Sequence, residues 1–235
     1  MNLIIGGSSG LGKSIVSRFS ETNKTIVVSR RNITPQKNII PLQIDINSGN
    51  LDELYNVIKN NELSNIFFTA GLIDWDKDDI FLDNKKSENI LLTNFISIKK
   101  IIIELIKKEK LSSNCLICFC SSATTILPRQ KQISYCAAKS ALNSFSKSLT
   151  SYLYVNGYSF RVVNLILGYM NTEMNENISL PFKKADPDKI AHYIFQKSNS
   201  LKGIYYMPRY WLLIKIIVSL IPEKILLKII KTLKI

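Results

Sequence analysis

The chain is poor in the residues that most often hold transition metals. Its only histidine is His192, and its four cysteines are Cys115, Cys118, Cys120 and Cys136. The first three cysteines lie in one apolar run typical of a buried strand, so no second ligand pair stands at a zinc-site spacing. We therefore expect no metal site and no disulfide framework, with the cysteines as small core residues and His192 in a structural role.

The sequence also lacks an apolar run of the roughly 20 residues that a membrane-spanning helix needs. No secretory signal is recognisable, because Met1 leads into Leu3, Ile4 and Ile5 without a basic start, and we expect a cytoplasmic protein. Internal repeats and low-complexity linkers are missing as well. A length of 235 residues with 46% hydrophobic content suits one domain with a sizeable core.

Acidic residues are scarce beside basic ones, at 18 against 31, which gives a net charge of +13. Such an excess indicates an anionic partner, whether nucleic acid, an anionic membrane or an acidic ligand. The excess is concentrated at the end of the sequence, where residues 202–235 contain a single acid, Glu223. The basic residues of this segment are Lys202, Arg209, Lys215, Lys224, Lys228, Lys231 and Lys234.

Short apolar runs alternate with longer segments of helical periodicity. The runs that predict strands are 3–5, 25–28, 39–44, 66–70, 115–120, 161–167 and 204–207. The segments that predict helices are 12–19, 51–60, 87–108, 134–155 and 187–197, the last of them opened by Asp186 as N-cap and Pro187. This alternation predicts an α/β fold, a doubly wound parallel sheet in three α/β/α layers.

A glycine-rich turn follows the first predicted strand and precedes the first predicted helix. It reads Gly6-Gly7-Ser8-Ser9-Gly10-Leu11-Gly12. Glycine lets the backbone approach a pyrophosphate closely, and the helix N-terminus directs N–H groups and a positive dipole end at the anion. The place of the turn between strand and helix indicates a Rossmann-type dinucleotide site.

No acidic residue follows the second predicted strand, where Asp or Glu would bind the ribose 2′-hydroxyl of NAD. Ser29, Arg30 and Arg31 stand there instead. Arg30 offers a planar cation suited to the 2′-phosphate of NADP, and Arg31 offers a second one. We therefore expect NADP(H) rather than NAD(H), the alternative being a solvated surface pair of arginines.

Tyr135 and Lys139 are one helical turn apart at the head of a predicted helix, so their side chains share a face. The ordinary pKa of tyrosine is near 10, and a neighbouring ammonium group lowers it by favouring the phenolate. A tyrosine tuned in this way can give a proton to a carbonyl oxygen or take one from an alcohol. This spacing is common by chance, so its weight depends on the motifs around it.

Together these motifs resemble the short-chain dehydrogenase/reductase family over roughly residues 1–208. The family's turn, Thr-Gly-x-x-x-Gly-x-Gly, is matched at all its glycines, with Ile5 in place of the threonine. The resemblance implies a catalytic tetrad of Asn94, Ser122, Tyr135 and Lys139. In that family the serine holds the substrate oxygen, the tyrosine transfers the proton, the lysine binds the nicotinamide ribose, and the asparagine supports a proton relay.

The resemblance also implies the cofactor contacts. Asp45 and Ile46 match an adenine-contacting position, and Thr172 matches a position at the nicotinamide amide. The whole implied set is Gly6, Ser8, Ser9, Gly10, Leu11, Gly12, Arg30, Arg31, Asp45, Ile46, Ala70, Gly71, Tyr135, Lys139, Gly168 and Thr172. Two family motifs are altered: Asn-Asn-Ala-Gly reads Phe68-Thr69-Ala70-Gly71, and Pro-Gly reads Leu167-Gly168.

The function that these features predict is an NADP(H)-dependent oxidoreductase. It would move a hydride between nicotinamide and a carbonyl or alcohol carbon of a small or lipophilic substrate. The alternative is a non-catalytic NADP-binding regulator or membrane-surface scaffold with the same fold. The resemblance further implies a homo-oligomer, a dimer or tetramer, built through the predicted helices 87–108 and 134–155.

Substrate choice in this fold is expected to come from loops beyond the strand ends. Residues 169–185 predict a small lid without a charged cluster. Leu127, Arg129 and Gln130 are candidates to line the pocket, although ordinary surface-loop residues would look the same.

Residues 209–235 form a tail after the domain predicted at 1–208. Residues 210–221 are apolar except for Lys215 and Ser219, and Pro222 ends the run. The next segment is amphipathic, with Lys224, Lys228 and Lys231 on one face. Such helices suit an anionic membrane surface, here the inner face of the membrane, and they suit equally a cover for the domain's own core or a dimer seam. No nucleic-acid motif is recognisable, so we expect no nucleic-acid partner.

Overall fold

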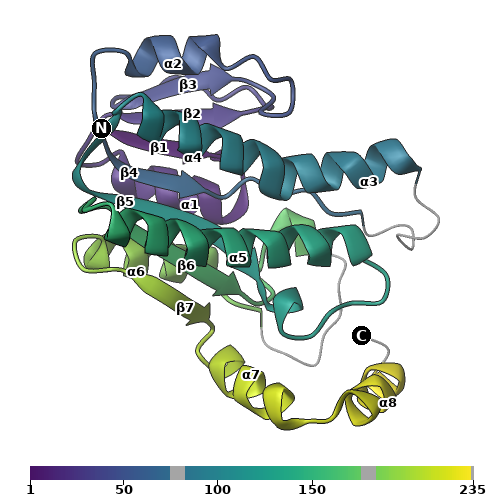
Figure 1. Ribbon diagram of the computed structural model, residues 1–235. Coiled ribbons are helices and arrows are strands. Elements are labelled where there is room, and N and C mark those ends of the chain that lie inside the picture. The colour runs from purple at the N-terminus through teal and green to yellow at the C-terminus, as the bar shows by residue number, and fades with distance from the viewer. Residues whose placement is uncertain (75–82, 176–183, 234–235) are drawn as a thin grey trace.

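The computed structural model describes residues 1–74, 83–175 and 184–233, which form one parallel sheet with helices on both faces (Figure 1). The order across the sheet is β3-β2-β1-β4-β5-β6-β7, and every pairing is parallel. The strands are β1 (Asn2–Ile5), β2 (Thr25–Ser29), β3 (Ile39–Gln43), β4 (Leu63–Phe68), β5 (Leu111–Ser122), β6 (Arg161–Leu167) and β7 (Gly203–Met207). The predicted doubly wound α/β fold is confirmed.

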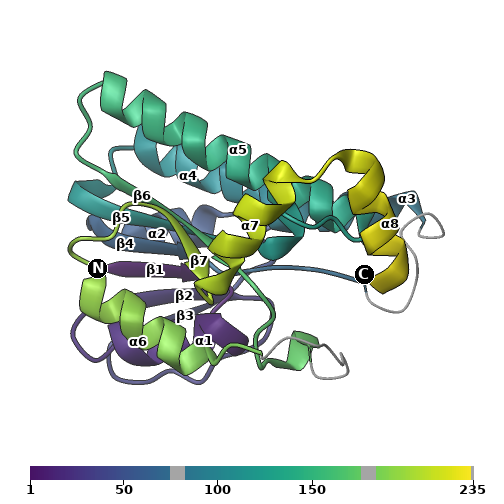
Figure 2. The same cartoon turned by 90° about the horizontal axis from the view of Figure 1, so that it is seen from below.

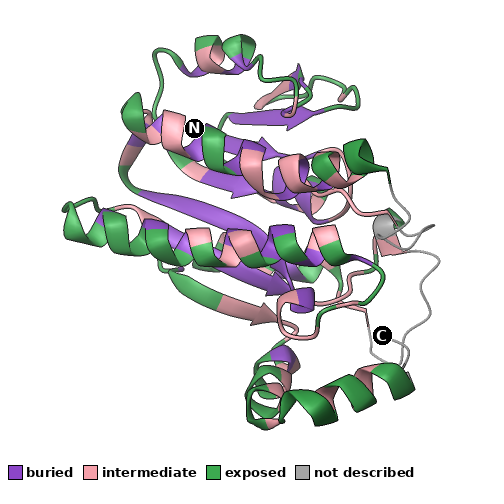
Figure 3. Cartoon of the chain, turned by 45° about the vertical axis from the view of Figure 1, so that its right-hand side comes forward, coloured by how far each residue is buried: buried purple, intermediate pink, exposed green. Residues whose placement is uncertain are grey.

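Helices cover both faces of the sheet, as Figures 1 and 2 show: α2 (Asp52–Ile58), α4 (Ser97–Lys107) and α5 (Ile133–Val155) on one face, and α1 (Gly10–Phe19) and α6 (Pro187–Lys197) on the other. Each face has its own core, because successive strand residues point to opposite sides. Ile5 and Val28 lie in the core under α4 and α5, whereas Ile4 and Val27 lie in the core under α1 and α6. Figure 3 shows the buried strands between the exposed outer sides of the helices.

The four cysteines are buried and carry free thiols, in agreement with the predicted core role. Three of them lie on β5, and Cys136 lies near the start of α5. His192 is exposed on α6.

The predicted helix 87–108 is interrupted. The structure has α3 (Asn84–Leu91), a π-helical turn at Leu92–Ile96 and then α4. A π-helical turn inserts one residue into the helical repeat, and such insertions occur often at functional sites. Asn94 is the middle residue of this turn.

β4 begins and ends earlier than the predicted 66–70. The backbone amides of Thr69 and Ala70 both donate to the carbonyl of Ile5, at 2.9 and 2.8 Å, so the regular ladder stops at Phe68. β6 and α6 have the predicted bounds, and the carboxylate of Asp186 caps α6 by accepting from the amide of Asp188 at 2.9 Å.

The tail forms two helices, α7 (Tyr210–Leu220) and α8 (Glu223–Leu233), beyond the β7 end of the sheet (Figures 1 and 2). Trp211 is 4% exposed and anchors α7, which packs against β7. The opposite side of α7 is apolar and exposed, and consists of Leu212, Leu213, Ile216, Ile217 and Leu220. Within the described residues, no helix has both the length and the apolar content to cross a membrane.

Candidate active site

The glycine turn lies at the point where the strand order reverses, since β1 has β2 on one side and β4 on the other. Ligands of open α/β sheets bind at this point, outside the carboxyl ends of the strands. Gly6 has a φ of +97°, and a Cβ on it would collide with the backbone of Ala70. A Cβ on Gly12 would likewise collide with the carbonyl of Gly6. The close approach that these glycines allow brings Thr69 and Ala70 against the turn.

The N-terminus of α1 opens onto the same crevice. Ser9 is its N-cap residue, yet the serine side chain makes no capping hydrogen bond and the first turn contains no acid. The first N–H groups and the positive helix end therefore suit a phosphate group. A Cβ on Gly10 would lie 3.1 Å from Cγ2 of Thr172, so Thr172 lies just across the turn. Ser8 is half-buried, whereas the Leu11 side chain is in the core and only its backbone can face a ligand.

The residues after β2 turn sharply and carry the two arginines into solvent. The amide of Arg31 donates to the Ser29 hydroxyl at 3.0 Å. Arg31 also pairs with Glu173, at 3.0 Å between Nη1 and Oε2, and so joins the turn after β2 to the segment after β6. The guanidinium of Arg30 is exposed beside it. The partner Glu173 is a residue that sequence reasoning missed.

Asp45 and Ile46 follow β3. Asp45 is exposed and its carboxylate accepts from the amide of Asn47 at 2.9 Å, whereas Ile46 is buried. Asn47 in turn donates to the Thr93 hydroxyl at 2.7 Å and accepts from Ser97 at 2.9 Å. The predicted adenine-contacting loop is thus tied to the helical segment that contains Asn94.

The two altered family motifs have structural roles. Thr69 donates through its hydroxyl to the carbonyls of Ile5 and Gly6, at 3.0 and 3.1 Å, and ties the end of β4 to the glycine turn. At the other motif, the amide of Gly168 donates to the carbonyl of Met207 at 2.9 Å. A Cβ on Gly168 would collide with the indole of Trp211, so the tail contacts a predicted cofactor position.

Asn94 is fully buried and uses its whole amide group. Its Nδ2 donates to the carbonyls of Leu72 and Ile90, at 2.7 and 2.8 Å, and its Oδ1 accepts from the amide of Leu72 at 3.3 Å. These bonds join the π-helical turn to the loop after β4. Asn94 therefore fixes the position of Leu72, the residue that follows Gly71.

Ser122 ends β5, and its hydroxyl accepts from the amide of Thr124 at 3.2 Å. Tyr135, in the first turn of α5, lies close enough to this serine for the two hydroxyl groups to interact. Burial raises the pKa of the Tyr135 phenol to about 12, and the interaction with Ser122 and the charge of Arg129 oppose the shift. The prediction that a neighbouring ammonium group lowers this pKa is therefore wrong for the chain as it stands, because desolvation outweighs the opposing charges.

Lys139 lies one turn after Tyr135 and is 4% exposed. Its ammonium group donates to the carbonyl of Cys120 at 2.9 Å and lies 5.6 Å from the centre of the Tyr135 ring. Burial lowers the pKa of Lys139 to about 8. Lysine and tyrosine thus share a helix face, as the spacing predicts, and the lysine is held by the strand that carries Ser122.

Arg129 supplies a charge beside Tyr135 that sequence reasoning underrated. Its guanidinium lies 4.4 Å above the ring of Tyr169, and its amide donates to the thiol of Cys136 at 3.4 Å. Its charge opposes the rise in the pKa of Tyr135. Arg129 appears in the sequence only as a candidate pocket residue, since nothing there shows that the loop before α5 folds back on the tyrosine. Of the predicted lid, residues 176–183 lie outside the described part of the chain.

The predicted catalytic residues come together at one edge of the sheet. Tyr135 lies beside Ser122, Lys139 is held by β5, and the π-helical turn with Asn94 packs against α5. A protonated phenol, a hydroxyl and a buried ammonium group beside a dinucleotide crevice can bind a carbonyl oxygen and deliver a proton to it. The glycine turn, the uncapped helix end and Thr172 fit a nicotinamide dinucleotide.

Comparisons with known proteins agree with this geometry. Residues 1–181 match the family model described as short chain dehydrogenase. The chain is 29% identical over 196 residues to 2,5-dichloro-2,5-cyclohexadiene-1,4-diol dehydrogenase LinX of Sphingobium indicum, covering 75% of each chain.

Solved structures show the same fold. One is a short chain dehydrogenase from Burkholderia cenocepacia in complex with NADP, with a TM-score of 0.76, 16% identity and coverage of 98% of this chain and 96% of that one. Another is the 3-ketoacyl-(acyl-carrier-protein) reductase from Brucella melitensis complexed with NADH, with a TM-score of 0.75, 19% identity and coverage of 88% and 97%. Because the family model matches most of the sequence, the chain belongs to the short-chain dehydrogenase family of oxidoreductases.

Proposed function

We propose that this protein is an NADP(H)-dependent oxidoreductase that transfers a hydride between nicotinamide and a carbonyl or alcohol carbon. The observation that carries the proposal is that Tyr135 lies beside Ser122 at the end of β5, with the buried Lys139 one turn along α5. The glycine turn before α1 would hold the pyrophosphate, and Thr172, which lies across the turn from Gly10, would contact the nicotinamide amide.

The chemistry divides between cofactor and chain. When bound, the nicotinamide supplies or accepts the hydride. Ser122 and Tyr135 hydrogen-bond the substrate oxygen, where negative charge develops, and Tyr135 passes its proton to that oxygen. Lys139 keeps a positive charge below the tyrosine, and Asn94 acts as a positioning residue that holds the loop after β4.

The protonation state of Tyr135 suits a proton donor. With a pKa of about 12 the phenol is protonated at neutral pH, as a donor to a carbonyl oxygen must be. Oxidation of an alcohol needs the phenolate, so the same site should oxidise alcohols best at higher pH.

The test is NADPH oxidation with a panel of ketones and aldehydes, compared with the Tyr135→Phe variant. We expect turnover by the wild type and a loss of at least about a hundredfold in kcat for the variant, the usual contribution of a positioned acid. NADPH binding, followed by cofactor fluorescence, should be unchanged. Binding without turnover by the wild type on the whole panel would favour the alternative, a non-catalytic NADP-binding regulator.

The preference for NADP(H) rests on Arg30. It is an exposed cation after β2, where no acid is present to bind a ribose hydroxyl, while Arg31 is engaged by Glu173. Solved structures of the same fold contain NADP in one case and NADH in another, so the fold does not indicate which cofactor this chain prefers. The preference must be argued from the chain's own residues. We expect Arg30→Asp to raise the KM for NADPH at least about tenfold and to lower that for NADH. Arg31→Asp serves as the matched variant and should have the smaller effect.

A second proposal concerns the tail, which we infer attaches to an anionic membrane surface. The exposed side of α7 carries five large apolar side chains, and α8 adds the exposed cations Lys224, Lys228 and Lys231. Contiguous apolar patches of this kind mark interaction sites, and flanking lysines complement anionic lipid. A membrane-bound enzyme of this class would act on a lipophilic or lipid-linked carbonyl compound.

Co-sedimentation with vesicles tests the tail. Wild-type protein should bind vesicles of phosphatidylglycerol and phosphatidylcholine but not of phosphatidylcholine alone, and Ile217→Glu on the exposed side should abolish binding. Lys24→Glu, in the exposed loop before β2, is the control for the change in charge. If Ile217→Glu instead changes the mass of the protein in solution, the apolar side is a subunit interface. The oligomer that we propose through α4 and α5 is checked by the same mass measurement.

A further inference from the structure

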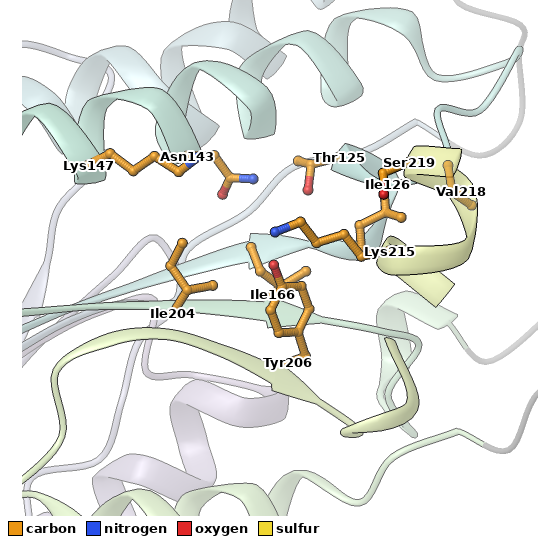
Figure 4. A pocket seen from close by; sticks show the side chains of 10 residues that line it. All are labelled: Thr125, Ile126, Asn143, Lys147, Ile166, Ile204, Tyr206, Lys215, Val218 and Ser219. Carbon is orange, nitrogen blue, oxygen red and sulfur yellow. The ribbon is translucent and has the colours of Figure 1, made fainter. Parts of the chain in front are cut away.

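A cavity of about 280 Å³ lies between α5, β6, β7 and the tail helix α7 (Figure 4). Its floor is apolar, formed by Ile166 of β6 and Ile204 of β7. Its volume is near the lower end of the range for small-ligand sites. Neither the glycine turn nor Tyr135 lines it, so it is separate from the proposed catalytic site.

The cavity is basic. Lys147 reaches it from α5 and Lys215 from α7, and among the described residues that line it none is acidic. In Figure 4 the Lys215 side chain extends across the space towards Tyr206, and its ammonium group is 5.6 Å from the centre of that ring. Both lysines are also in contact with solvent, so the cavity is open to ligands from outside. An anion between the two ammonium groups would be attracted by both.

A neutral donor faces the same space. Asn164 is 2% exposed, and its Nδ2 donates to Oδ1 of Asn143 at 2.7 Å. Because the oxygen of Asn143 is engaged from below, its NH₂ group faces the cavity, as Figure 4 shows. The hydroxyl of Tyr206 points into the cavity from the opposite side. Fixed donors of this kind are what distinguish an anion site from two surface lysines.

We infer that this cavity binds a phosphate group, held by Lys147 and Lys215 and by the Asn143 amide, with the organic part of the ligand against Ile166 and Ile204. The two ammonium groups match a phosphate dianion better than a single carboxylate. The phosphate can belong to a soluble phosphate ester or to a lipid headgroup, since Lys215 stands on the helix whose other side is exposed and apolar.

The site would also join two parts of the chain. Lys147 lies on the stripe of α5 that carries Tyr135, Lys139 and Asn143 at successive turns, whereas Lys215 lies on the tail. A ligand that bridges the two lysines would hold α7 against the sheet.

Titration calorimetry with glycerol 3-phosphate, and with inorganic phosphate, tests the soluble source on the full chain. Sedimentation with phosphatidylcholine vesicles that contain phosphatidic acid tests the lipid source. Lys147→Ala and Lys215→Ala should each weaken binding about tenfold, the size expected for one charge-assisted contact. Lys147 is an exposed residue of the long helix α5, so Lys147→Ala should not disturb the fold. It therefore still tests the site if Lys215→Ala displaces the tail.

Two control variants locate the effect. Lys24→Ala removes an exposed charge in the loop before β2, outside both the cavity and the tail, and Arg30→Ala removes the cation at the proposed dinucleotide site; both should bind as the wild type does. A loss in the soluble arm alone identifies a phosphate ester, and a loss in the vesicle arm identifies a lipid. Absence of binding by the wild type in both arms, or equal losses in the control variants, overturns the inference. Neither readout depends on turnover, so the result is independent of the proposed reaction.

Discussion

The ammonium group of Lys139 donates a hydrogen bond of 2.9 Å to the carbonyl of Cys120, two residues before β5 ends at Ser122. The bond is shielded from water, since Lys139 is 4% exposed. A buried ammonium group is costly, and the cost appears as a pKa lowered to about 8. The position that holds the lysine in place therefore also makes its charged form less stable than it is in water.

Stability should therefore rise with pH between about 8 and 10. In this window the unfolded chain holds the Lys139 proton and the folded protein has released it, so each increase in pH favours folding. We expect Lys139→Met to flatten this rise, which is on the order of 3 kcal/mol in full. Urea unfolding at pH values across the window measures it, with Lys100→Met, an exposed lysine of α4, as control. An unchanged slope in Lys139→Met would show that the lysine is not desolvated.

Arg129 should set the pH dependence of alcohol oxidation. Its charge favours the Tyr135 phenolate, so Arg129→Gln should raise the pKa of the tyrosine further. Oxidation, which needs the phenolate, should become about tenfold slower at a fixed pH, with its profile moved to higher pH, whereas reduction near neutrality changes little. Lys131→Gln on the same loop is the matched control. Identical profiles for the two variants would rule out a specific role for Arg129.

Asn94→Ala should destabilise the protein by about 2–4 kcal/mol, because it leaves buried backbone groups of Leu72 and Ile90 without a partner. Asn60→Ala, in an exposed turn, should change stability little. Chemical denaturation gives both values. A cost below about 0.5 kcal/mol for Asn94→Ala would mean that water replaces the amide group readily.

Gly168 and Trp211 should be strongly coupled. Gly168→Ala places a methyl group in the indole and should cost about 1–3 kcal/mol by overpacking, while Trp211→Ala should cost about 3–5 kcal/mol. In the double variant the missing indole leaves room for the methyl group, so its cost should be below the sum of the two. Urea unfolding of all four proteins closes the cycle, and additive costs would show that α7 is not seated on Gly168.

Sequence patterns located most of the fold because its strands are apolar on both faces and alternate with segments of helical periodicity. The bounds of β6 and α6 were predictable from an unbroken apolar run and from Asp186-Pro187. β4 was misplaced, since the double hydrogen bond to Ile5 that ends it depends on the neighbouring strand. Similarly, the π-helical turn at Asn94 depends on a contact with Leu72, which helical periodicity does not contain.

In the candidate site, too, the features set by local sequence could be predicted, whereas those set by tertiary contacts could not. Local spacing gave Tyr135 and Lys139 a common helix face, and the resemblance to the family implied Ser122 and Asn94. The charge of Arg129 near Tyr135 and the pairing of Arg31 with Glu173 arise from loops that meet only in the folded chain. The direction of the tyrosine pKa shift was mispredicted because burial, a tertiary property, outweighs the neighbouring charges.

The contact between Gly168 and Trp211 restricts how these two positions can change during evolution. One atom more at position 168 would occupy the place of the indole, so neither position is free to vary alone. Relatives that carry a bulkier residue after the sixth strand should have lost this aromatic anchor, and those that keep the tryptophan should keep the glycine. Paired substitution at these two sites would therefore serve as a genetic signature of a docked tail.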